Sequence, residues 1–268
     1  MQAFVIDAFT DRPFRGNPAA VCFVESPLSD DRMLSIAREF NLSETAFVAR
    51  LGAAGTFSIR FFSPKMEIAL CGHATLAAAR AVHAVEGLDE VHFQNIQGLD
   101  LAARISADRI SMEFPDYDLE PATAPPALLA ALGIEVLRNA AYNKETKILL
   151  LEIASAPELA GLKPDFDALQ RAHSSINGVL VTAPSGNDGY DFHSRYFWPW
   201  SGTNEDPVTG GTHTFLTRYW ATRLGKTRMR SFQCSPRSGF MEVELKGGRV
   251  VITSQAVIVL EARMSIEG

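Results

Sequence analysis

The 268-residue chain is short of cysteine and has neither a long apolar run nor a basic run. Its three cysteines, Cys22, Cys71 and Cys234, are an odd and sparse set, which favours free thiols in a reducing compartment over a disulfide framework. No apolar run approaches the roughly 20 residues needed to cross a bilayer. The start of the chain meets Asp7 without a preceding basic segment, which argues against a secretory signal. We therefore expect a cytoplasmic protein without a membrane partner.

The sequence lacks the motifs that several classes of ligand require. With 25 basic and 31 acidic residues the net charge is −6, and no Lys/Arg cluster offers the basic stripe that nucleic-acid binding needs. The six histidines include no tight ligand pair, so a metal site is not expected. No glycine-rich phosphate loop occurs either, so no nucleotide cofactor is implied.

The composition, 47% hydrophobic and 21% charged, is that of an ordinary globular protein. Short segments rich in β-branched or aromatic residues predict strands in the first half at 3–6, 20–24, 46–49, 56–62, 91–94, 99–105 and 111–114. Similar segments in the second half predict strands at 136–142, 147–153, 179–182, 191–198, 241–245 and 250–260. Helices are predicted at 31–39, 73–84, 126–132, 166–172 and 212–224.

Three prolines between Pro121 and Pro126 disfavour regular structure, which suggests a linker over residues 118–126. This divides the chain into a first domain, 1–117, and a second, 127–268. We leave open that the last strand of the chain completes the first domain.

The segment 73–84 is apolar on nearly every face and built largely from small residues. A helix that is apolar all round is a buried helix, and small side chains let surrounding backbone approach closely. A sheet rolled around this central helix would satisfy the pattern.

The two halves share a repeated element. Glu67 stands five residues before Gly72, Glu205 stands five residues before Gly210, and a long helix follows each glycine. We expect pseudo-twofold symmetry, with two glycine-opened helix starts facing a shared cleft. Helix N-termini favour anions, so such a cleft suits a small carboxylate-bearing molecule. The alternative is that both glycines merely form tight turns.

Five motifs in register carry a resemblance that spans essentially the whole chain. They are Asp7-Ala-Phe-Thr10, Phe14-Arg-Gly-Asn-Pro-Ala-Ala20, Asn41-Leu-Ser-Glu-Thr45, Cys71-Gly-His-Ala-Thr75 and Glu205-Asp-Pro-Val-Thr-Gly210. With them the chain resembles the phenazine-biosynthesis-protein-like (PhzF-like) isomerase family, which shares the diaminopimelate epimerase fold. The cysteine before Gly72 and the segment Gln233-Cys-Ser-Pro-Arg-Ser-Gly239 also resemble the animal phenazine-biosynthesis-like-domain proteins.

The resemblance implies an α/β (α+β) fold of two similar domains, each a mostly antiparallel sheet rolled around a central helix. It implies a cofactor-free isomerase with its active site between the domains, acting on a small-molecule carboxylate. It also implies a homodimer.

By resemblance, Glu44 matches the family's general acid/base, a role that moving a proton between two carbons requires. An enclosed cleft can raise the pKa of a carboxylate toward neutrality. His73 would orient or protonate the substrate, and a helix N-terminus favours its neutral imidazole. Asp206 would face the substrate from the second domain. From the residues alone, these side chains could equally be a surface acid, a core histidine and a helix-capping acid.

The resemblance places Asn17 near the floor of the cleft, where residues 16–18 could otherwise form a simple turn. Gly72, Gly210 and Gly211 would offer backbone N–H groups to a substrate carboxylate. Phenazine enzymes usually carry Ser at the position of Gly211, so the substrate is in doubt.

Cys71 stands where two-cysteine epimerases place one thiol, but the partner position is Thr209, a poor base. A symmetric two-cysteine racemase is therefore disfavoured. A one-sided Cys71-dependent epimerase or dehydratase remains open, as does a buried, inert Cys71. A third possibility is a binding or regulatory protein on the same scaffold.

Overall fold

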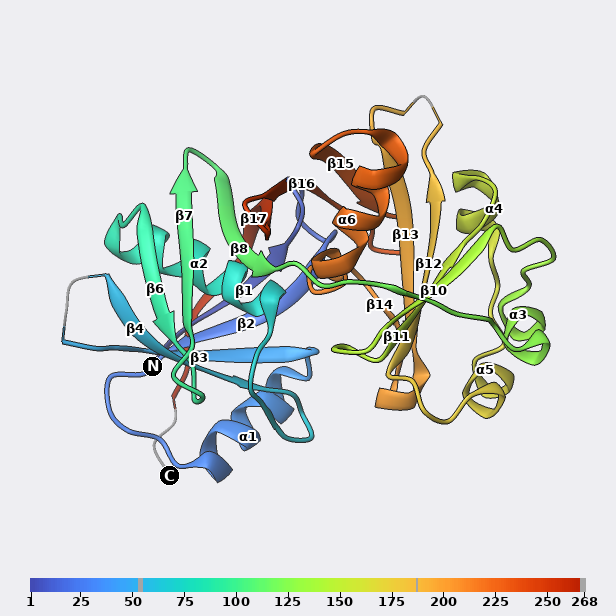
Figure 1. The fold of residues 1–268 in the computed structure, drawn as a ribbon. Helices are drawn as coiled ribbons and strands as arrows, with labels where there is room; N and C mark the ends of the chain where they lie inside the picture. The colour runs from blue at the N-terminus through green and yellow to red at the C-terminus, as the bar shows by residue number, and fades with distance from the viewer. Residues whose placement is uncertain (53–54, 187, 266–268) are drawn as a thin grey trace. The chain divides into compact units, whose positions relative to one another are not determined.

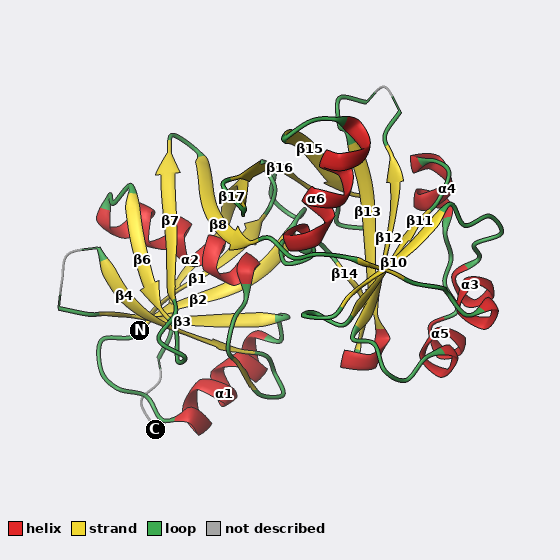
Figure 2. Cartoon of the chain, viewed as in Figure 1, coloured by secondary structure: helices red, strands yellow, loops and turns green. Residues whose placement is uncertain are grey.

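The computed structural model describes residues 1–52, 55–186 and 188–265. The chain forms two compact units. Unit 1 contains residues 1–113 and the C-terminal segment from 252, and unit 2 contains residues 114–251. Figure 1 traces both units along the chain, and Figure 2 shows that each combines strands with helices.

Eight strands of unit 1 form a closed ring. Around the ring, hydrogen bonds join β1 to β2, β2 to β3, β3 to β4, β4 to β6, β6 to β7, β7 to β8, β8 to β17 and β17 to β1. The pairs β2–β3 and β4–β6 are parallel. The pairs β1–β2, β3–β4, β6–β7, β7–β8 and β17–β1 are antiparallel. The strands are β1 (Gln2–Ala8), β2 (Asn17–Phe23), β3 (Glu44–Arg50), β4 (Thr56–Phe62), β6 (Glu90–Gln94), β7 (Asp100–Ser106), β8 (Arg109–Pro115) and β17 (Arg249–Arg263). The short β5 (Glu67–Ile68) extends from β4.

Helix α2 (Gly72–Glu86) packs against β1, β2, β3, β6 and β7 of this ring. Its alanines explain the fit, because Ala74, Ala77, Ala78, Ala79 and Ala81 are all fully buried. A larger side chain at these positions would meet strand backbone, since protein interiors are packed without spare space. The helix ends at Gly87, which adopts φ 69°. The predicted buried central helix is confirmed.

Helix α1 (Asp30–Phe40) crosses from β2 to β3 and packs on β3 and β4. The side chain of Ser29 accepts a hydrogen bond from the Arg32 N–H, and Asp30 and Asp31 lie in the first turn. Met33, Ile36 and Ala37 face the interior, as expected for an amphipathic helix.

Unit 2 repeats the strand order of unit 1. β11 and β12 are parallel, β12 and β13 antiparallel, β13 and β15 parallel, and β15 and β16 antiparallel. The same relations join β2, β3, β4, β6 and β7. The unit 2 strands are β9 (Glu120–Pro121), β10 (Asn139–Asn143), β11 (Ile148–Glu152), β12 (Gly178–Pro184), β13 (Phe192–Trp198), β14 (Thr203–Asp206), β15 (Arg228–Gln233) and β16 (Gly239–Lys246).

Helix α6 (His213–Leu224) stands in unit 2 where α2 stands in unit 1, between the short strand β14 and the parallel strand β15. Trp220 stacks on Phe192 of β13, with ring centroids 5.5 Å apart, and its indole N–H donates to Thr182 of β12. A separate apolar core includes residues of α3 (Pro126–Leu132), α4 (Ala156–Gly161) and α5 (Phe166–Ala172). A short 3₁₀ turn, Pro199–Ser201, follows β13.

An arginine–glutamate ion pair, partly buried in unit 1 and nearly buried in unit 2, marks the same place in both units. Arg60 of β4 donates two hydrogen bonds to Glu67 of β5, each 2.7 Å long, and Arg195 of β13 donates two to Glu205 of β14, at 2.7 and 2.8 Å. These are the glutamates five residues before Gly72 and Gly210. The predicted fold class of two pseudo-symmetric units with the diaminopimelate epimerase fold is confirmed.

The segment 118–126, predicted as a linker, contains strand β9, which pairs with β10, and ends where α3 begins. Strand β17 pairs with β1 of unit 1. Sequence patterns missed β5, β9, β14, β15 and α4, which are two to six residues long. The other predicted strands and helices are present, with ends shifted by a few residues.

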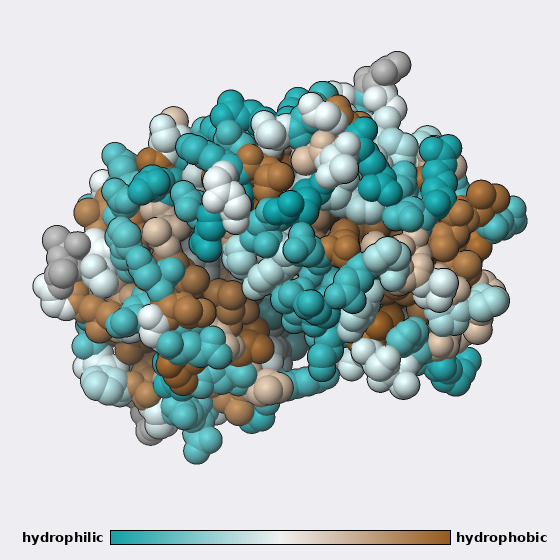
Figure 3. Space-filling model, viewed as in Figure 1, coloured by the Kyte–Doolittle hydropathy of each residue, from teal (hydrophilic) through white to brown (hydrophobic). Residues whose placement is uncertain are grey.

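Polar side chains cover most of the face drawn in Figure 3, with apolar side chains in separate groups among them. No helix in the described part of the chain is long and apolar enough to cross a membrane.

Ala78→Leu tests the burial of α2. The isopropyl group that leucine adds at this fully buried position should lower the free energy of unfolding by about 1–3 kcal/mol, because overpacking forces strain on the surrounding strands. Ala84→Leu, at an exposed position of the same helix, should change it by less than about 0.5 kcal/mol. Urea titration of both variants measures the difference. Equal effects would contradict an enclosed helix.

Candidate active site

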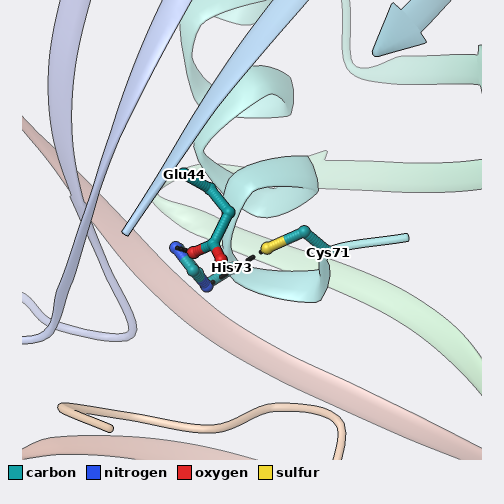
Figure 4. A group of neighbouring side chains, drawn as sticks. All are labelled: Glu44, Cys71 and His73. Atoms are coloured by element: carbon teal, nitrogen blue, oxygen red, sulfur yellow. Dashed lines mark hydrogen bonds and ion pairs between the residues drawn. The ribbon is translucent and has the colours of Figure 1, made fainter. Parts of the chain in front are cut away.

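Three chemically active side chains meet in unit 1, at the start of helix α2 (Figure 4). Glu44 is the first residue of β3, Cys71 immediately precedes α2, and His73 is its second residue. Because α2 packs against β3, its first turn lies beside the beginning of that strand. The fold thus joins two motifs that are about thirty residues apart in sequence.

The imidazole of His73 bridges the other two groups. Its Nε2 lies 3.1 Å from Glu44 Oε2, and its Nδ1 lies 3.3 Å from Cys71 Sγ. All three residues are more than nine-tenths buried, with exposed fractions of 8–9%. The three groups are therefore shielded from solvent but not sealed from it.

Two further polar side chains touch the same imidazole. The amide Nδ2 of Asn17 lies 3.4 Å from His73 Nδ1, and Ser43 Oγ lies 3.4 Å from His73 Nε2. Gly16 (φ 66°) precedes Asn17, and a Cβ there would lie only 2.1 Å from the carbonyl oxygen of Ala8. A glycine is thus required for the turn that starts β2 at Asn17.

Glu44 corrects one expectation. Burial by itself raises the pKa of its carboxyl group, but the hydrogen bond and positive charge of His73 act against it, with further hydrogen bonds from Ser43 and Cys71. The net result is a pKa below the ordinary value of 4.5. The expected rise toward neutrality is wrong, because a paired carboxylate keeps its charge even when it is buried. Glu44 is ionised at neutral pH.

His73 corrects a second expectation. Burial lowers its pKa, but the sulfur of Cys71 and the carboxylate of Glu44 outweigh burial and hold the pKa well above 6.5. The helix N-terminus favours a neutral imidazole, but the adjacent acidic groups favour the imidazolium more strongly. Burial raises the pKa of the Cys71 thiol. The directions of these shifts favour a carboxylate–imidazolium pair of Glu44 and His73, with the Cys71 sulfur beside the ring.

The start of α2 is open to an anion. Cys71, at the N-cap, makes no side-chain capping hydrogen bond, and no acid lies in the first turn, within the residues that the structure describes. The surface helices α1, α4 and α5 are each capped by a Ser or Asp side chain and carry an acid in the first turn. The first N–H groups of an uncapped helix are free to bind a carboxylate. Gly72 is the first residue of α2, as the proposed anion site needs.

A second polar group lies in unit 2, at the loop between β14 and α6. Asp206 is buried, and its carboxylate accepts a hydrogen bond from the hydroxyl of Thr209. Gln233 of β15 accepts from the Thr209 N–H at 2.9 Å and donates to the Asp206 carbonyl at 2.8 Å. Asp206 is not the cap of α6, since Thr212 occupies that position.

Gly210 and Gly211 lie in the turn before α6, and like α2 this helix has no side-chain cap and no acid in its first turn. A Cβ at Gly211 would meet no atom within 4 Å. A serine would therefore fit at this position. The fold therefore gives no steric reason for glycine in place of serine at position 211, where the serine hydroxyl is missing. Burial lowers the pKa of the neighbouring His213 to about 4, so its imidazole is neutral.

The strand registers show what unit 2 holds in place of Glu44. Ala19 pairs with Glu44 where β3 begins, and Ile148 pairs with Gly178 where β12 begins. Gly178 is thus the counterpart of Glu44. The ring of Tyr196 fills the space beside it, because a Cβ on Gly178 would lie 2.5 Å from the phenol oxygen. Thr209 stands at the position of the repeat that corresponds to Cys71. The two units are therefore alike in fold but differ in the side chains at equivalent positions.

Sequence reasoning did not single out Ser43, Tyr196 or Gln233. Ser43 and Gln233 lie inside motifs that carried the family resemblance, so their place in the motif was the available signal. Tyr196 lies in the aromatic stretch 192–200, a pattern that is typical of core packing. Its relation to Gly178 follows from strand register, which the sequence does not display.

Two duplicated units, each with an uncapped central helix, and one buried acid–imidazole pair define an epimerase-type isomerase scaffold. Comparison with known proteins agrees. The family model described as "Phenazine biosynthesis-like protein" matches residues 6–262. An uncharacterized isomerase of Pseudomonas aeruginosa is 42% identical over 267 residues, covering 98% of both chains.

A mouse phenazine biosynthesis-like domain-containing protein is 40% identical over 283 residues and 98% of both chains. The crystal structure of a PhzF-family phenazine biosynthesis protein from Enterococcus faecalis has a TM-score of 0.90 and 37% identity. It covers 98% of this chain and 99% of that one. The chain belongs to the phenazine biosynthesis-like (PhzF) family. This membership supports an isomerase or epimerase role.

The pH dependence of stability tests the Glu44–His73 pair. The lowered pKa of Glu44 stabilises the fold above about pH 4.5, and this contribution is lost as pH falls through the folded pKa. The raised pKa of His73 stabilises the fold below about pH 6.5, and this contribution is lost as pH rises through the folded pKa.

Thermal unfolding of the wild type and of Glu44→Gln should therefore differ most between about pH 4.5 and 6.5, and should converge at both extremes. Glu39→Gln, on the exposed side of α1, serves as the control and should run parallel to the wild type. A difference that is constant across the whole range would show that the two groups do not form an ion pair.

Proposed function

We propose that this protein is a cofactor-independent isomerase that moves a proton between carbons of a small carboxylate-bearing metabolite, with Glu44 as the general acid/base. The observation that carries the proposal is the buried Glu44 carboxylate, 3.1 Å from His73 at the uncapped start of α2. One group is charged and basic, its neighbour is cationic, and both lie beside a helix end that favours an anion.

In this mechanism the substrate carboxylate binds the free N–H groups at Gly72 and His73. The Glu44 carboxylate then takes a proton from a carbon, whose bonding electrons pass into the adjacent unsaturated system. The carboxylic acid so formed returns a proton to another position, which restores the carboxylate. The imidazolium of His73 stabilises the negative charge that develops on the substrate.

The low pKa of Glu44 arises from its contacts with His73, Ser43 and Cys71. A bound substrate carboxylate adds a negative charge near Glu44 and competes for the hydrogen bonds of His73. Like charges raise the pKa of a carboxyl group, so substrate binding should make Glu44 a stronger base. The pair thus keeps the base ionised until substrate arrives.

The differences between the units support a single base. Gly178 replaces Glu44 in unit 2 and Thr209 replaces Cys71, so a symmetric exchange between two equivalent bases has no matching groups. We propose that Asp206 assists, with Thr209 and Gln233 holding its carboxylate and backbone in place. We also propose that the protein acts in the cytoplasm, as its sparse cysteines favour, and, on family resemblance, that it is a homodimer.

One observation favours a second mechanism. Cys71 Sγ lies 3.3 Å from His73 Nδ1, and a thiol beside an imidazole can be activated as a base or nucleophile. A Cys71-dependent epimerase or dehydratase would use this pair. Against it stands the raised pKa of Cys71, which keeps the thiol protonated.

Glu44→Gln should reduce kcat by about 10²–10⁴, because the amide cannot accept a proton. Ligands are found first by thermal shift against a metabolite library, and turnover is then followed by deuterium uptake from heavy water. Glu39→Gln is the matched control for charge loss, and Asp206→Asn tests the second unit with the same assay. Wild-type turnover in Glu44→Gln would rule out this mechanism, and ligand binding without any deuterium uptake would favour a binding protein.

Cys71→Ala separates the two mechanisms. If Glu44 is the base, kcat should stay within about tenfold of the wild type, since only a neighbouring hydrogen-bond partner is lost. If Cys71 is the base, the same change should abolish turnover while Glu44→Gln has the smaller effect. Cys234→Ala, in unit 2, controls for the loss of a thiol elsewhere.

A further inference from the structure

The same three side chains have a property that proton transfer does not require. Glu44, Cys71 and His73 each offer one ligand atom, and these oxygen, sulfur and nitrogen atoms all lie within 4.8 Å of one another. One carboxylate, one thiolate and one imidazole form a ligand set of mixed hardness that suits Zn²⁺, whereas Mg²⁺ and Ca²⁺ prefer oxygen atoms alone.

We propose that this cluster is a Zn²⁺-binding site, with Glu44, Cys71 and His73 as ligands and the fourth position open. Tetrahedral bonds of about 2.3 Å to sulfur and about 2.1 Å to nitrogen would separate those two atoms by about 3.6 Å. The observed Cys71 Sγ to His73 Nδ1 distance is 3.3 Å. The Glu44 carboxylate contacts Nε2 of the ring and accepts a hydrogen bond from Cys71, and it has to turn toward the Nδ1 side to share the ion.

Charge and surroundings favour the ion. Binding replaces the thiol proton of Cys71 and the second imidazole proton of His73, which pass to solvent. Zn²⁺ with a carboxylate and a thiolate is then neutral overall, which lowers the cost of burial. Ser43 Oγ lies 3.4 Å from Nε2, the ring nitrogen that keeps its proton, and can accept a hydrogen bond that orients the ligand.

The consequence for activity rests on the proposed function. A bound ion would hold the carboxylate that has to accept the proton and would remove the imidazolium, so Zn²⁺ would switch the isomerase off until a chelator removes it. The spacing of histidines along the sequence gave no sign of this site, because one ligand comes from β3 and two come from the start of α2.

The test uses the metals alone and needs no substrate. The full-length, chelator-treated protein should bind one Zn²⁺ per chain in equilibrium dialysis and no Mg²⁺. Its Co²⁺ complex should show a thiolate-to-metal charge-transfer band in the near ultraviolet and the intense visible bands of a four-coordinate ion.

Cys71→Ser should abolish the charge-transfer band, and Cys234→Ser should retain it. Glu44→Gln should keep the band while weakening Zn²⁺ affinity by at least about tenfold, as expected for loss of a metal ligand. Circular dichroism confirms that each variant is folded. Absence of stoichiometric Zn²⁺ binding, or a band that persists in Cys71→Ser, would overturn the site. Neither result depends on turnover, which the deuterium experiment tests separately in metal-free protein.

Discussion

The chemistry of this chain depends on one packing constraint, which is that helix α2 must fit inside a closed ring of strands. Most side chains that α2 buries against the ring are alanines, so the helix packs close to the strands. Its first turn consequently lies beside the first residue of β3. Glu44 and His73 are brought within 3.1 Å of each other by backbone packing, before either side chain contributes an interaction. The buried charge pair can then form because its geometry is already provided.

The duplicated ion pairs show how the loops that lead into the two central helices are held. Arg60 and Arg195 each bind a glutamate of a very short strand with two parallel hydrogen bonds. A two-residue or four-residue strand has few backbone hydrogen bonds of its own. A planar guanidinium–carboxylate contact adds directional restraint where the chain turns toward the helix start. The same arginine–glutamate contact occurs in both units, although the side chains at the two helix starts differ.

Sequence patterns predicted the features that depend on local composition. The alanine-rich segment predicted a buried helix, and the Glu-to-Gly spacing predicted the repeat that the strand registers display. Family motifs indicated Glu44, His73 and Asp206, whose roles remain proposals. The protonation states were predicted wrongly, because they depend on which groups face His73. Helix position alone favours a neutral imidazole, but Glu44 comes from another strand and Cys71 turns its sulfur to the ring, and together they reverse the balance.

The two units share a scaffold but place different side chains at equivalent positions. In unit 1 the first residue of the third strand is a glutamate facing an imidazole. In unit 2 the equivalent residue is Gly178, and the phenol of Tyr196 occupies the space that a side chain there would need. Burial raises the pKa of Tyr196, and the nearby Asp206 charge adds to this, so the phenol stays neutral. A neutral phenol can donate a hydrogen bond but cannot take a proton from carbon. On the proposed function, both helix starts are suited to an anion, but only unit 1 places a carboxylate against an imidazole at the start of its third strand, which is the asymmetry that a one-base proton transfer requires.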